Sequence, residues 1–532
     1  MLELAARAAE LGIVAEYDDA RGVRRFVPDE TLRKLLDAFG QSQASDMAPL
    51  LWRRGRIQAL DLPFTEPHDW TLTSAGQEVA RGEAQRRLTV PDDVPIGTYA
   101  IAFTPRGAGA QPVLTHLLVA PEQAYQLDDV GVDRVWALAV QLYGVRSRRN
   151  WGHGDFTDLL NLVRMCPDLG AAGIGLNPLH ALFDDRPEQA SPYAPNSRLF
   201  LNPLYVDLEA IPEFPGIAEA GLAAEIERLR GTDQVDYTGV AAAKTKALRL
   251  AYERFCRSRK RDRKAAFKAF QADQGEALAR FAAFEVLRRR FQNVWWEWPP
   301  EWRRPTDKQL KALRKQAAAE IGYYEFVQWI ADEQLGRCQE EARRLRLPVG
   351  LYIDLAVGVE PGGADAWSAQ ESIIGKVEVG APPDLLNTAG QAWGLAAFNP
   401  RALERAGFAP FAELLHAAMR HAGAIRLDHV LGLNRLYLIP FGAKPHEGAY
   451  VRYPLQQLLG IAAIESVRDR CLVIGEDLGT VPDELRVVLA DWGIWSYLVM
   501  LFERRADGSF KHPHEYRKNA LATFSTHDLP TF

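Results

Sequence analysis

The sequence predicts an α/β protein whose main domain is a (β/α)8 TIM barrel, and three observations carry this prediction. Seven short apolar segments alternate with helical patterns from residue 134 onward. Three of these segments end in an acid, at Asp428, Glu476 and Asp528. The parallel strands of a barrel are buried on both faces and read as continuous apolar runs, and the side chains at their C-terminal ends form the functional face. We therefore expect three acids to converge on one barrel mouth.

The chain begins with two smaller parts that do not fit the barrel pattern. Residues 1–60 predict a small helical module, because Pro28 and Asp29 precede an i, i+3, i+4, i+7 apolar stripe that ends at Gly40. Residues 61–124 predict a β-sandwich-like domain, since the segment 98–104 alternates large apolar and small residues between Pro and Gly turns. This β-domain fits a carbohydrate-binding module, a passive spacer or a dimer surface.

The barrel itself is expected over residues 125–532, interrupted between its second and third strands by a helical insertion at about 208–345. The seven expected strands are 134–141, 173–178, 347–354, 424–428, 471–477, 496–502 and 521–528. The last barrel strand is missing from this count. Because an open seam would expose strand edges, we expect the natural chain to continue beyond Phe532.

The amino-acid composition limits the classes of molecule that the protein is expected to bind. The net charge is −6, from 63 basic and 69 acidic residues, which argues against a generally electropositive surface for nucleic acid or membrane. The basic run at 257–264 reads as a solvated helix face rather than a nucleic-acid contact, because no base-stacking pattern accompanies it. Trp295–Trp298 reads either as a packed helix end or as a ligand platform.

The four cysteines lie at least 82 residues apart, so no zinc-type spacing or disulfide framework is visible, and we expect buried, reduced thiols. The N-terminal residues lack a basic segment followed by a long apolar one, and no run of 18 uncharged apolar residues occurs. We therefore expect a cytoplasmic protein with no membrane partner, and neither a metal nor an organic cofactor.

Paired carboxyl groups suit the cleavage of a glycosidic bond, which needs one group to protonate the leaving oxygen and a second to act as nucleophile or base. Arg426 lies two residues before Asp428, on the same face of the strand, and would keep that carboxylate ionised. Glu476 needs a partly apolar setting to remain protonated. Asp477 beside it is expected to make local hydrogen bonds. Taken singly, each strand-end acid equally fits a helix cap or a partner for an arginine.

Several longer motifs accompany the acids. They are Gln141–Arg146, Asn150–Asp155, Asn177–His180, Ser191–Arg198, Asn202–Tyr205, Gly380–Asp384 and Gly390–Gly394. With the three acid segments in order, residues 134–532 resemble the 4-α-glucanotransferases, the amylomaltase or disproportionating-enzyme family (glycoside hydrolase family 77), which are relatives of the α-amylases. The preceding residues are similar to the N-terminal extension of a long bacterial form of this family.

The resemblance implies a role for each candidate residue. Asp428 would be the nucleophile that forms a covalent glucosyl-enzyme, Glu476 the acid/base and Asp528 the group that stabilises the transition state. The implied glucan contacts are Arg426, His429 and His527 at the cleavage point and Tyr193, Asp354, Gln391 and Trp393 along the groove. Without the resemblance, the two histidines read as neutral core residues. The segment 358–380 reads as a Gly-rich loop, which by analogy overhangs the acceptor site and excludes water.

The three acids and the family resemblance together predict a 4-α-glucanotransferase that moves α-1,4-glucan segments between maltodextrins by a retaining double displacement. The expected partners are maltodextrins and glycogen or starch-derived α-1,4-glucans. An α-glucan hydrolase with the same three acids is the alternative enzyme, and a glucan-binding protein without turnover is the alternative from another class. The sequence specifies neither the preferred chain length nor the oligomeric state.

Overall fold

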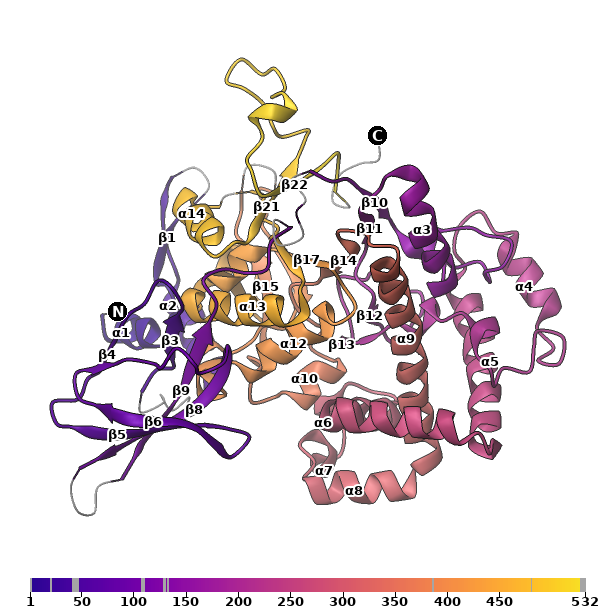
Figure 1. Ribbon diagram of the computed structural model, residues 1–532, viewed down its shortest axis with the longest axis horizontal. Coiled ribbons are helices and arrows are strands. Elements are labelled where there is room, and N and C mark those ends of the chain that lie inside the picture. The colour runs from indigo at the N-terminus through magenta and orange to yellow at the C-terminus, as the bar shows by residue number, and fades with distance from the viewer. Residues whose placement is uncertain are drawn as a thin grey trace. The chain divides into compact units, whose positions relative to one another are not determined.

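The computed structural model describes residues 2–19, 22–40, 47–106, 111–127, 131, 134–384, 387–479 and 481–526 (Figure 1). The chain divides into two compact units. The first unit consists of Met1–Gly131, Glu371–Met419 and Ala424–Phe532, and the second unit consists of Val132–Gln370 and Arg420–Gly423.

In the second unit, three parallel strands pair in the order β10-β11-β14. They are β10 (Ala137–Val140), β11 (Gly173–Leu176) and β14 (Gly350–Leu355). Helix α3 (Phe156–Leu169) connects the first two, and it begins with a capping box between Asp155 and Asp158. Gly173 is required where β11 meets β14, because a Cβ there would lie 2.0 Å from the carbonyl oxygen of Gly350.

The second unit contains a helical insertion before β14. Its helices are α4 (Ala223–Arg230), α5 (Tyr237–Arg257), α6 (Arg261–Phe291), α7 (Pro300–Arg303), α8 (Asp307–Gln316) and α9 (Ala318–Arg344). The small antiparallel pair of β12 (His180–Ala181) and β13 (Ser197–Leu201) precedes them. Aromatic rings join α5, α6 and α9, since Phe255 contacts Phe267, Phe326 and Trp329 at centroid distances of 5.0–5.6 Å.

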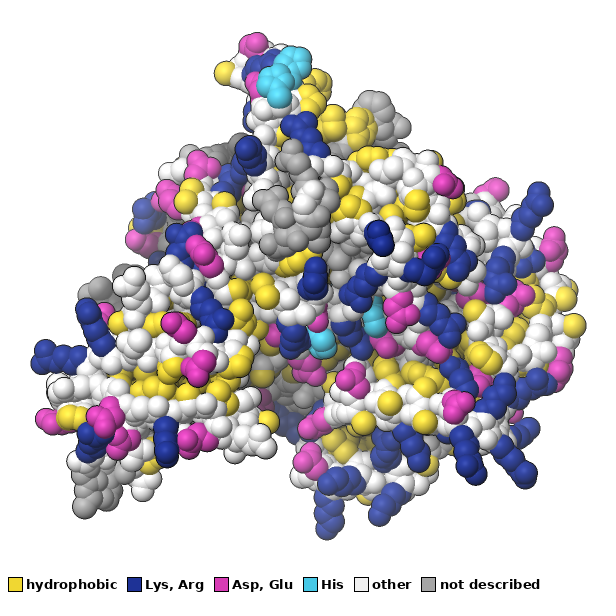
Figure 2. All heavy atoms as spheres, in the orientation of Figure 1, with side chains coloured by type: hydrophobic (Ala, Val, Ile, Leu, Met, Phe, Trp, Pro, Cys, Tyr) yellow, Lys and Arg dark blue, Asp and Glu magenta, His cyan; other side chains and the backbone are white. Residues whose placement is uncertain are grey.

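The basic run at 257–264 contributes contacts within the insertion. Arg263 pairs with Glu213 at 3.2 Å and Glu333 at 2.9 Å, and its guanidinium lies 4.1 Å from the centroid of the Trp329 ring. In Figure 2, basic side chains gather over the insertion helices with acidic side chains among them. In the Trp295–Trp298 segment, Trp298 is buried against Phe284, as expected of a packed helix end.

In the first unit, four parallel strands pair in the order β17-β20-β21-β22. They are β17 (Ala424–Leu427), β20 (Leu472–Gly475), β21 (Trp495–Val499) and β22 (Ala520–Thr523). The helices of this part are α11 (Pro400–Arg405), α12 (Ala409–Met419), α13 (Leu455–Asp469) and α14 (Asp483–Asp491). All seven predicted barrel strands therefore occur where the apolar runs placed them.

The first unit also contains an antiparallel sheet that the sequence patterns did not predict. Its order is β16-β15-β18-β19. The strands are β15 (Val377–Ala381), β16 (Gln391–Leu395), β18 (Arg435–Pro440) and β19 (Ala449–Arg452). The interpretation of 358–380 as loop was therefore incomplete, because this segment contains helix α10 (Ala364–Ser368) and most of β15.

The N-terminal part of the first unit combines two helices with a five-stranded sheet of order β3-β9-β8-β5-β6 (Figure 1). The helices are α1 (Leu2–Glu10) and α2 (Asp29–Phe39). The sheet strands are β3 (Leu50–Arg53), β5 (His68–Ser74), β6 (Gln77–Ala84), β8 (Gly97–Pro105) and β9 (Val113–Ala120). The pairs β1 (Glu16–Asp18) with β2 (Arg24–Phe26) and β4 (Leu60–Asp61) with β7 (Arg87–Leu88) are separate.

The apolar stripe of α2 behaves as the sequence predicted. Leu32, Leu35 and Phe39 are buried, and Gly40 ends the helix with a φ of +63°. The sheet buries Trp70, Ile101 and other residues in a core of its own.

The cysteines are in part buried. Of the four free cysteines, Cys166, Cys338 and Cys471 are buried, whereas Cys256 corrects the expectation of buried thiols, because it is exposed near the end of α5. Among the described residues, no helix has the length and apolar character needed to cross a bilayer.

Candidate active site

The two acids that follow β17 and β20 are placed side by side by the register of those strands. Leu427 pairs with Gly475, so Asp428 and Glu476 are each the next residue along neighbouring strands. The amide of Glu476 donates to the carbonyl of Leu427 at 2.9 Å, which continues the ladder to the strand ends. Adjacent strands lie about 4.8 Å apart. The register therefore places both acids at the C-terminal edge of this part of the barrel.

Arg426 provides the positive charge next to Asp428. Its Nη1 lies 2.8 Å from Oδ1 of Asp428, and its guanidinium lies 5.0 Å from the centroid of the Tyr497 ring on β21. The arginine side chain is 5% exposed and that of Asp428 is 19% exposed. A fixed, buried guanidinium favours the ionised form of a neighbouring carboxyl. Asp428 is thus a partly exposed carboxylate that is paired with a buried arginine.

Glu476 has a different environment. Burial raises the pKa of its carboxyl, while the charge of Arg426 and the backbone N–H groups of Leu478 and His429 oppose the shift. These amides donate to Oε1 at 2.8 Å and to Oε2 at 3.0 Å respectively, so both oxygens are held in place. A carboxyl whose pKa is raised retains its proton to higher pH. Burial therefore shifts the pKa of Glu476 in the direction that a proton donor needs.

Asp477, the neighbour of Glu476, points into the packing between β20 and the following elements. Its Oδ1 accepts from the amide of Tyr497 at 3.0 Å, and its Oδ2 accepts from the hydroxyl of Ser496 at 2.8 Å. Nε of Arg486 donates to Oδ2 at 3.1 Å. With 3% of its surface exposed, Asp477 joins β20, β21 and α14 and makes the local bonds expected of it.

His429 continues the β17 strand end in a left-handed conformation, with φ of +50°. Such a φ is uncommon outside glycine and often marks a functional segment. The ring meets Trp393 edge to face at a centroid distance of 5.3 Å, and Nε1 of Trp393 donates to Oε1 of Gln391 at 3.0 Å. Burial, helped by the charge of Arg435, lowers the pKa of His429 to about 4. The imidazole is therefore neutral at neutral pH.

In the second unit, the structure brings together two further predicted residues. The Tyr193 hydroxyl donates to Oδ2 of Asp354 at 2.7 Å. Asp354 is the penultimate residue of β14 and is 5% exposed. Tyr193 belongs to the Ser191–Arg198 motif that precedes and includes the start of β13. A strand-end carboxylate is thus oriented by a tyrosine from a separate loop.

The buried residues that hold this loop were not predicted from sequence. Nη1 of Arg198 donates to the carbonyls of Ala356 and Val357 at 3.0 and 2.7 Å. Oδ1 of Asn196 accepts from the amide of Ala364 at 2.8 Å, and its Nδ2 donates to Glu285 at 2.6 Å. These bonds fasten the segment after β14. The only local signal was that one Asn and one Arg follow the two prolines of this motif, which does not reveal that their side chains are buried.

Two predicted residues, His527 and Asp528, lie outside the described residues, which end at Thr526.

In the described part of the chain, one cluster has the composition of a metal site: His416, Glu465 and Asp469, whose ligand atoms lie within 4.8 Å of one another. Arg468 pairs with both acids of this cluster and so offsets part of their negative charge. The cluster lies on α12 and α13, away from the strand ends that carry the predicted acids.

Comparison with known proteins matches residues 140–532 to the family described as 4-alpha-glucanotransferase. The 4-alpha-glucanotransferase of Haemophilus influenzae is 36% identical over 557 aligned positions, covering 99% of this chain and 79% of that protein. The enzyme of the same name from Mycobacterium tuberculosis is 34% identical, with 100% and 80% covered.

Among solved structures, the amylomaltase of Corynebacterium glutamicum superposes with a TM-score of 0.83 at 30% identity, covering 100% of this chain and 80% of that one. Amylomaltase from Streptococcus agalactiae, solved with acarbose, shares the fold with a TM-score of 0.63 at 20% identity, covering 74% of this chain and 80% of that one. These matches confirm the predicted barrel fold and the predicted transferase activity. The chain belongs to the 4-alpha-glucanotransferase family, glycoside hydrolase family 77.

Proposed function

We propose that this enzyme transfers α-1,4-glucan segments between maltodextrins with Asp428 as nucleophile and Glu476 as general acid and base. The observation that carries this assignment is the contrast between two acids at matched positions of paired strands. Asp428 is ion-paired with Arg426, whereas burial raises the pKa of Glu476. Retaining glycosidases need one carboxylate and one carboxylic acid about 5–5.5 Å apart, close to the spacing of neighbouring strands.

In the first step, the Glu476 carboxyl gives its proton to the glycosidic oxygen, and the bond between this oxygen and the anomeric carbon breaks. The Asp428 carboxylate attacks the opposite face of that carbon and forms a glucosyl ester, while the leaving glucan departs with a new 4-hydroxyl. In the second step, ionised Glu476 removes the proton from the 4-hydroxyl of an acceptor glucan. The resulting oxygen displaces Asp428, and two inversions restore the α configuration.

The remaining predicted residues are proposed to hold the sugar at this centre. Arg426 and the neutral His429 are assigned to contacts with the hydroxyls of the glucose unit at the cleavage point. The indole of Trp393 has its N–H bonded to Gln391, which fixes the ring and leaves it to contact the apolar face of a glucose unit. Tyr193 and Asp354 are assigned to the glucan groove. Asp528 and His527 are assigned to hydroxyls of the distorted sugar in the transition state.

The competing α-glucan hydrolase would use the same covalent intermediate with water as the acceptor. We favour a sugar acceptor because the family that matches residues 140–532 and the relatives compared above are 4-alpha-glucanotransferases. The proposed substrates are maltodextrins and glycogen or starch-derived α-1,4-glucans, and the proposed location is the cytoplasm.

Incubation of the purified chain with maltotriose, with products resolved over time, tests the proposal. Transfer predicts free glucose together with maltotetraose and longer maltodextrins. Glucose and maltose without longer products would establish the hydrolase instead. Maltotriose that is bound but unchanged would establish a glucan-binding protein without turnover.

A further inference from the structure

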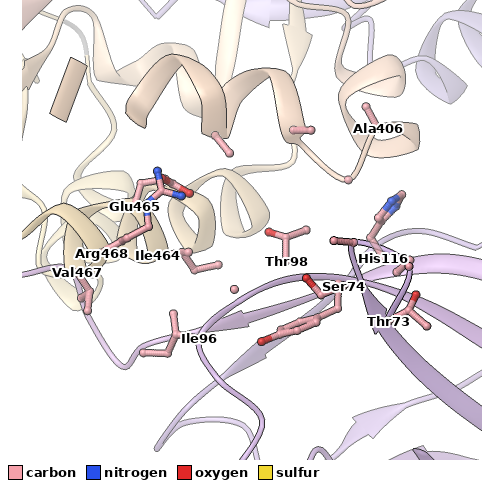
Figure 3. Close-up of a pocket in the computed structure, with 18 residues that line it drawn as sticks. Thr73, Ser74, Ile96, Thr98, His116, Ala406, Ile464, Glu465, Val467 and Arg468 are labelled. Atoms are coloured by element: carbon pink, nitrogen blue, oxygen red, sulfur yellow. The ribbon is translucent and has the colours of Figure 1, made fainter. Parts of the chain in front are cut away.

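A cavity of about 670 Å³ lies in the first unit between the five-stranded sheet and helices of the barrel (Figure 3). One wall comes from the β5–β6 turn, the start of β8 and His116 on β9. The other comes from the residues around the start of α12 and the end of α13. Ligand cavities typically occupy about 300–1,000 Å³. The hollow is therefore large enough for a small organic molecule.

The two walls offer different chemistry. Hydroxyl groups of Thr73, Ser74 and Thr98 line the strand side, and Figure 3 shows Thr98 between the strands and the helices. The helix side provides aliphatic surface, including Ile464 and Val467. A hydroxyl can both donate and accept a hydrogen bond, as a sugar hydroxyl does. Hydroxyls facing aliphatic surface match the polar rim and apolar face of a pyranose ring.

The cavity does not select a charged ligand. The guanidinium of Arg468 is balanced by Glu465 on the same helix and lies 3.8 Å from Asp469. Burial lowers the pKa of His116, so its imidazole is neutral at neutral pH. Because the arginine that lines the cavity is already paired within the protein, an anionic ligand would gain no unpaired cation from it.

One end of the cavity is closed by direct contact between the two walls. Gly407 has a φ of +57°, and a Cβ at this position would lie 2.5 Å from the ring of His116. Only glycine allows the imidazole to come this close. The residues before α12 therefore contact β9 at Gly407 and His116, and the cavity lies beside this contact.

The cavity is also distinct from the catalytic centre. Val467 and Arg468 lie just before β20, whereas Glu476 follows it, so cavity and acid lie at opposite ends of this strand. A ligand in the cavity would not occupy the position of the sugar undergoing transfer.

We propose that this cavity is a second, non-catalytic binding site for a short stretch of α-glucan. The inference rests on the proposed substrate class. A long glucan held here keeps its remaining chain at high effective concentration near the enzyme, and this raises the occupancy of the catalytic groove without a new catalytic contact. The gain is expected for polymers and long maltodextrins and not for maltotriose.

A pair of tryptophan substitutions on one strand tests the proposal. Thr98 lies in the cavity, whereas Thr104 is an exposed residue on the same face of β8, outside the cavity. Both variants are made in an Asp428→Asn background to prevent turnover and titrated calorimetrically with maltoheptaose. We expect Thr104→Trp to retain two classes of site, and Thr98→Trp to lose one of them by filling the cavity.

If the two variants bind the same number of maltoheptaose molecules per chain, the proposal of a second site is wrong. Ser74→Trp, at the exposed end of β5, gives the same test if Thr98→Trp does not fold. Absence of maltoheptaose binding in every variant would contradict the proposed substrate class itself, which distinguishes that failure from failure of the second site. In the background with Asp428 intact, both β8 variants should turn over maltotriose equally, while Thr98→Trp alone migrates faster through native gels containing glycogen.

Discussion

At the scale of single residues, Asp428 and Glu476 illustrate how two carboxyl groups at matched strand positions acquire different electrostatic surroundings. Arg426 is fixed on the strand that carries Asp428, so its effect could be predicted from a spacing of two residues. The surroundings of Glu476 could not be predicted from the sequence. Its burial and its backbone N–H donors depend on how β17 and the residues after it are placed beside β20.

Replacement of Asp428 with Asn should abolish formation of the glucosyl ester while retaining the shape of the site. We expect kcat to fall by on the order of 10⁴-fold and the dissociation constant for maltodextrin to change by only a few-fold. Single-turnover kinetics and calorimetry measure the two quantities. A loss of affinity as large as the loss of rate would contradict the role of nucleophile.

Replacement of Glu476 with Gln should be most damaging for donors whose leaving group needs a proton. We expect a rate loss of about 10³-fold with maltotriose and a much smaller loss with an α-maltosyl fluoride donor. Equal slowing of both donors would exclude Glu476 as the acid.

The pH dependence of the first step follows from the same group. Since burial raises the pKa of Glu476, the acid form persists above the ordinary range of a glutamic acid, and kcat/KM should fall only as pH rises through the raised value. The fluoride donor should lack this alkaline limb. In the Glu476→Gln variant, the residual activity should no longer fall as pH rises. If kcat/KM of that variant still falls at alkaline pH, the titrating group is another residue.

At the scale of elements, the barrel strands could be predicted because each is buried on both faces and reads as an uninterrupted apolar run. The β16-β15-β18-β19 sheet could not, because β15 pairs with β18, almost 60 residues later, and its Val377–Ala381 sequence follows a Gly-rich stretch. Pairing between distant segments leaves only a weak local signal in a short strand.

The bonds of Asp477 predict a measurable contribution to the packing of β20, β21 and α14. Asp477→Ala removes the acceptor of the Tyr497 amide, of the Ser496 hydroxyl and of Nε of Arg486, and should lower the free energy of unfolding by about 3 kcal/mol. Asp483→Ala is the matched control, because Asp483 pairs with the same arginine at 3.1 Å but its side chain is 95% exposed.

Thermal and denaturant unfolding compare the two variants. The control should stay within about 0.5 kcal/mol of the parent, as is usual for an exposed ion pair. Similar losses in both would show that the arginine, rather than the buried carboxylate, determines the stability of this contact.

At the scale of the whole molecule, the N-terminal sheet and the second half of the barrel form part of one compact unit. Arg53, from β3, makes much of this connection. It donates to the carbonyls of Glu122 at 2.7 Å and Asp491 at 2.6 Å, and lies 3.9 Å from the centroid of the Trp492 ring. Sequence patterns identified both parts but gave no sign of this contact, because each of its residues looks ordinary in its own segment.

Arg53→Ala should therefore lower the unfolding free energy by about 2–4 kcal/mol and increase proteolysis in the N-terminal part. Arg56→Ala provides the comparison, since Arg56 also pairs with Asp491 and Glu122, at 3.3 and 3.1 Å, but is half exposed. Its expected cost is about 0–1 kcal/mol. Limited proteolysis and unfolding curves that fail to separate the two variants would show that Arg53 does not join these parts.

The parallel register of β17 with β20 also bears on how this enzyme tolerates insertions. The spacing of Asp428 and Glu476 is set by backbone hydrogen bonds on the strands and not by the length of chain between them. That intervening chain already accommodates β18, β19 and α13. Evolution can therefore lengthen or shorten it without altering the distance between the two carboxyl groups, provided that the strands do not slip by a residue, which would turn one acid away from the other.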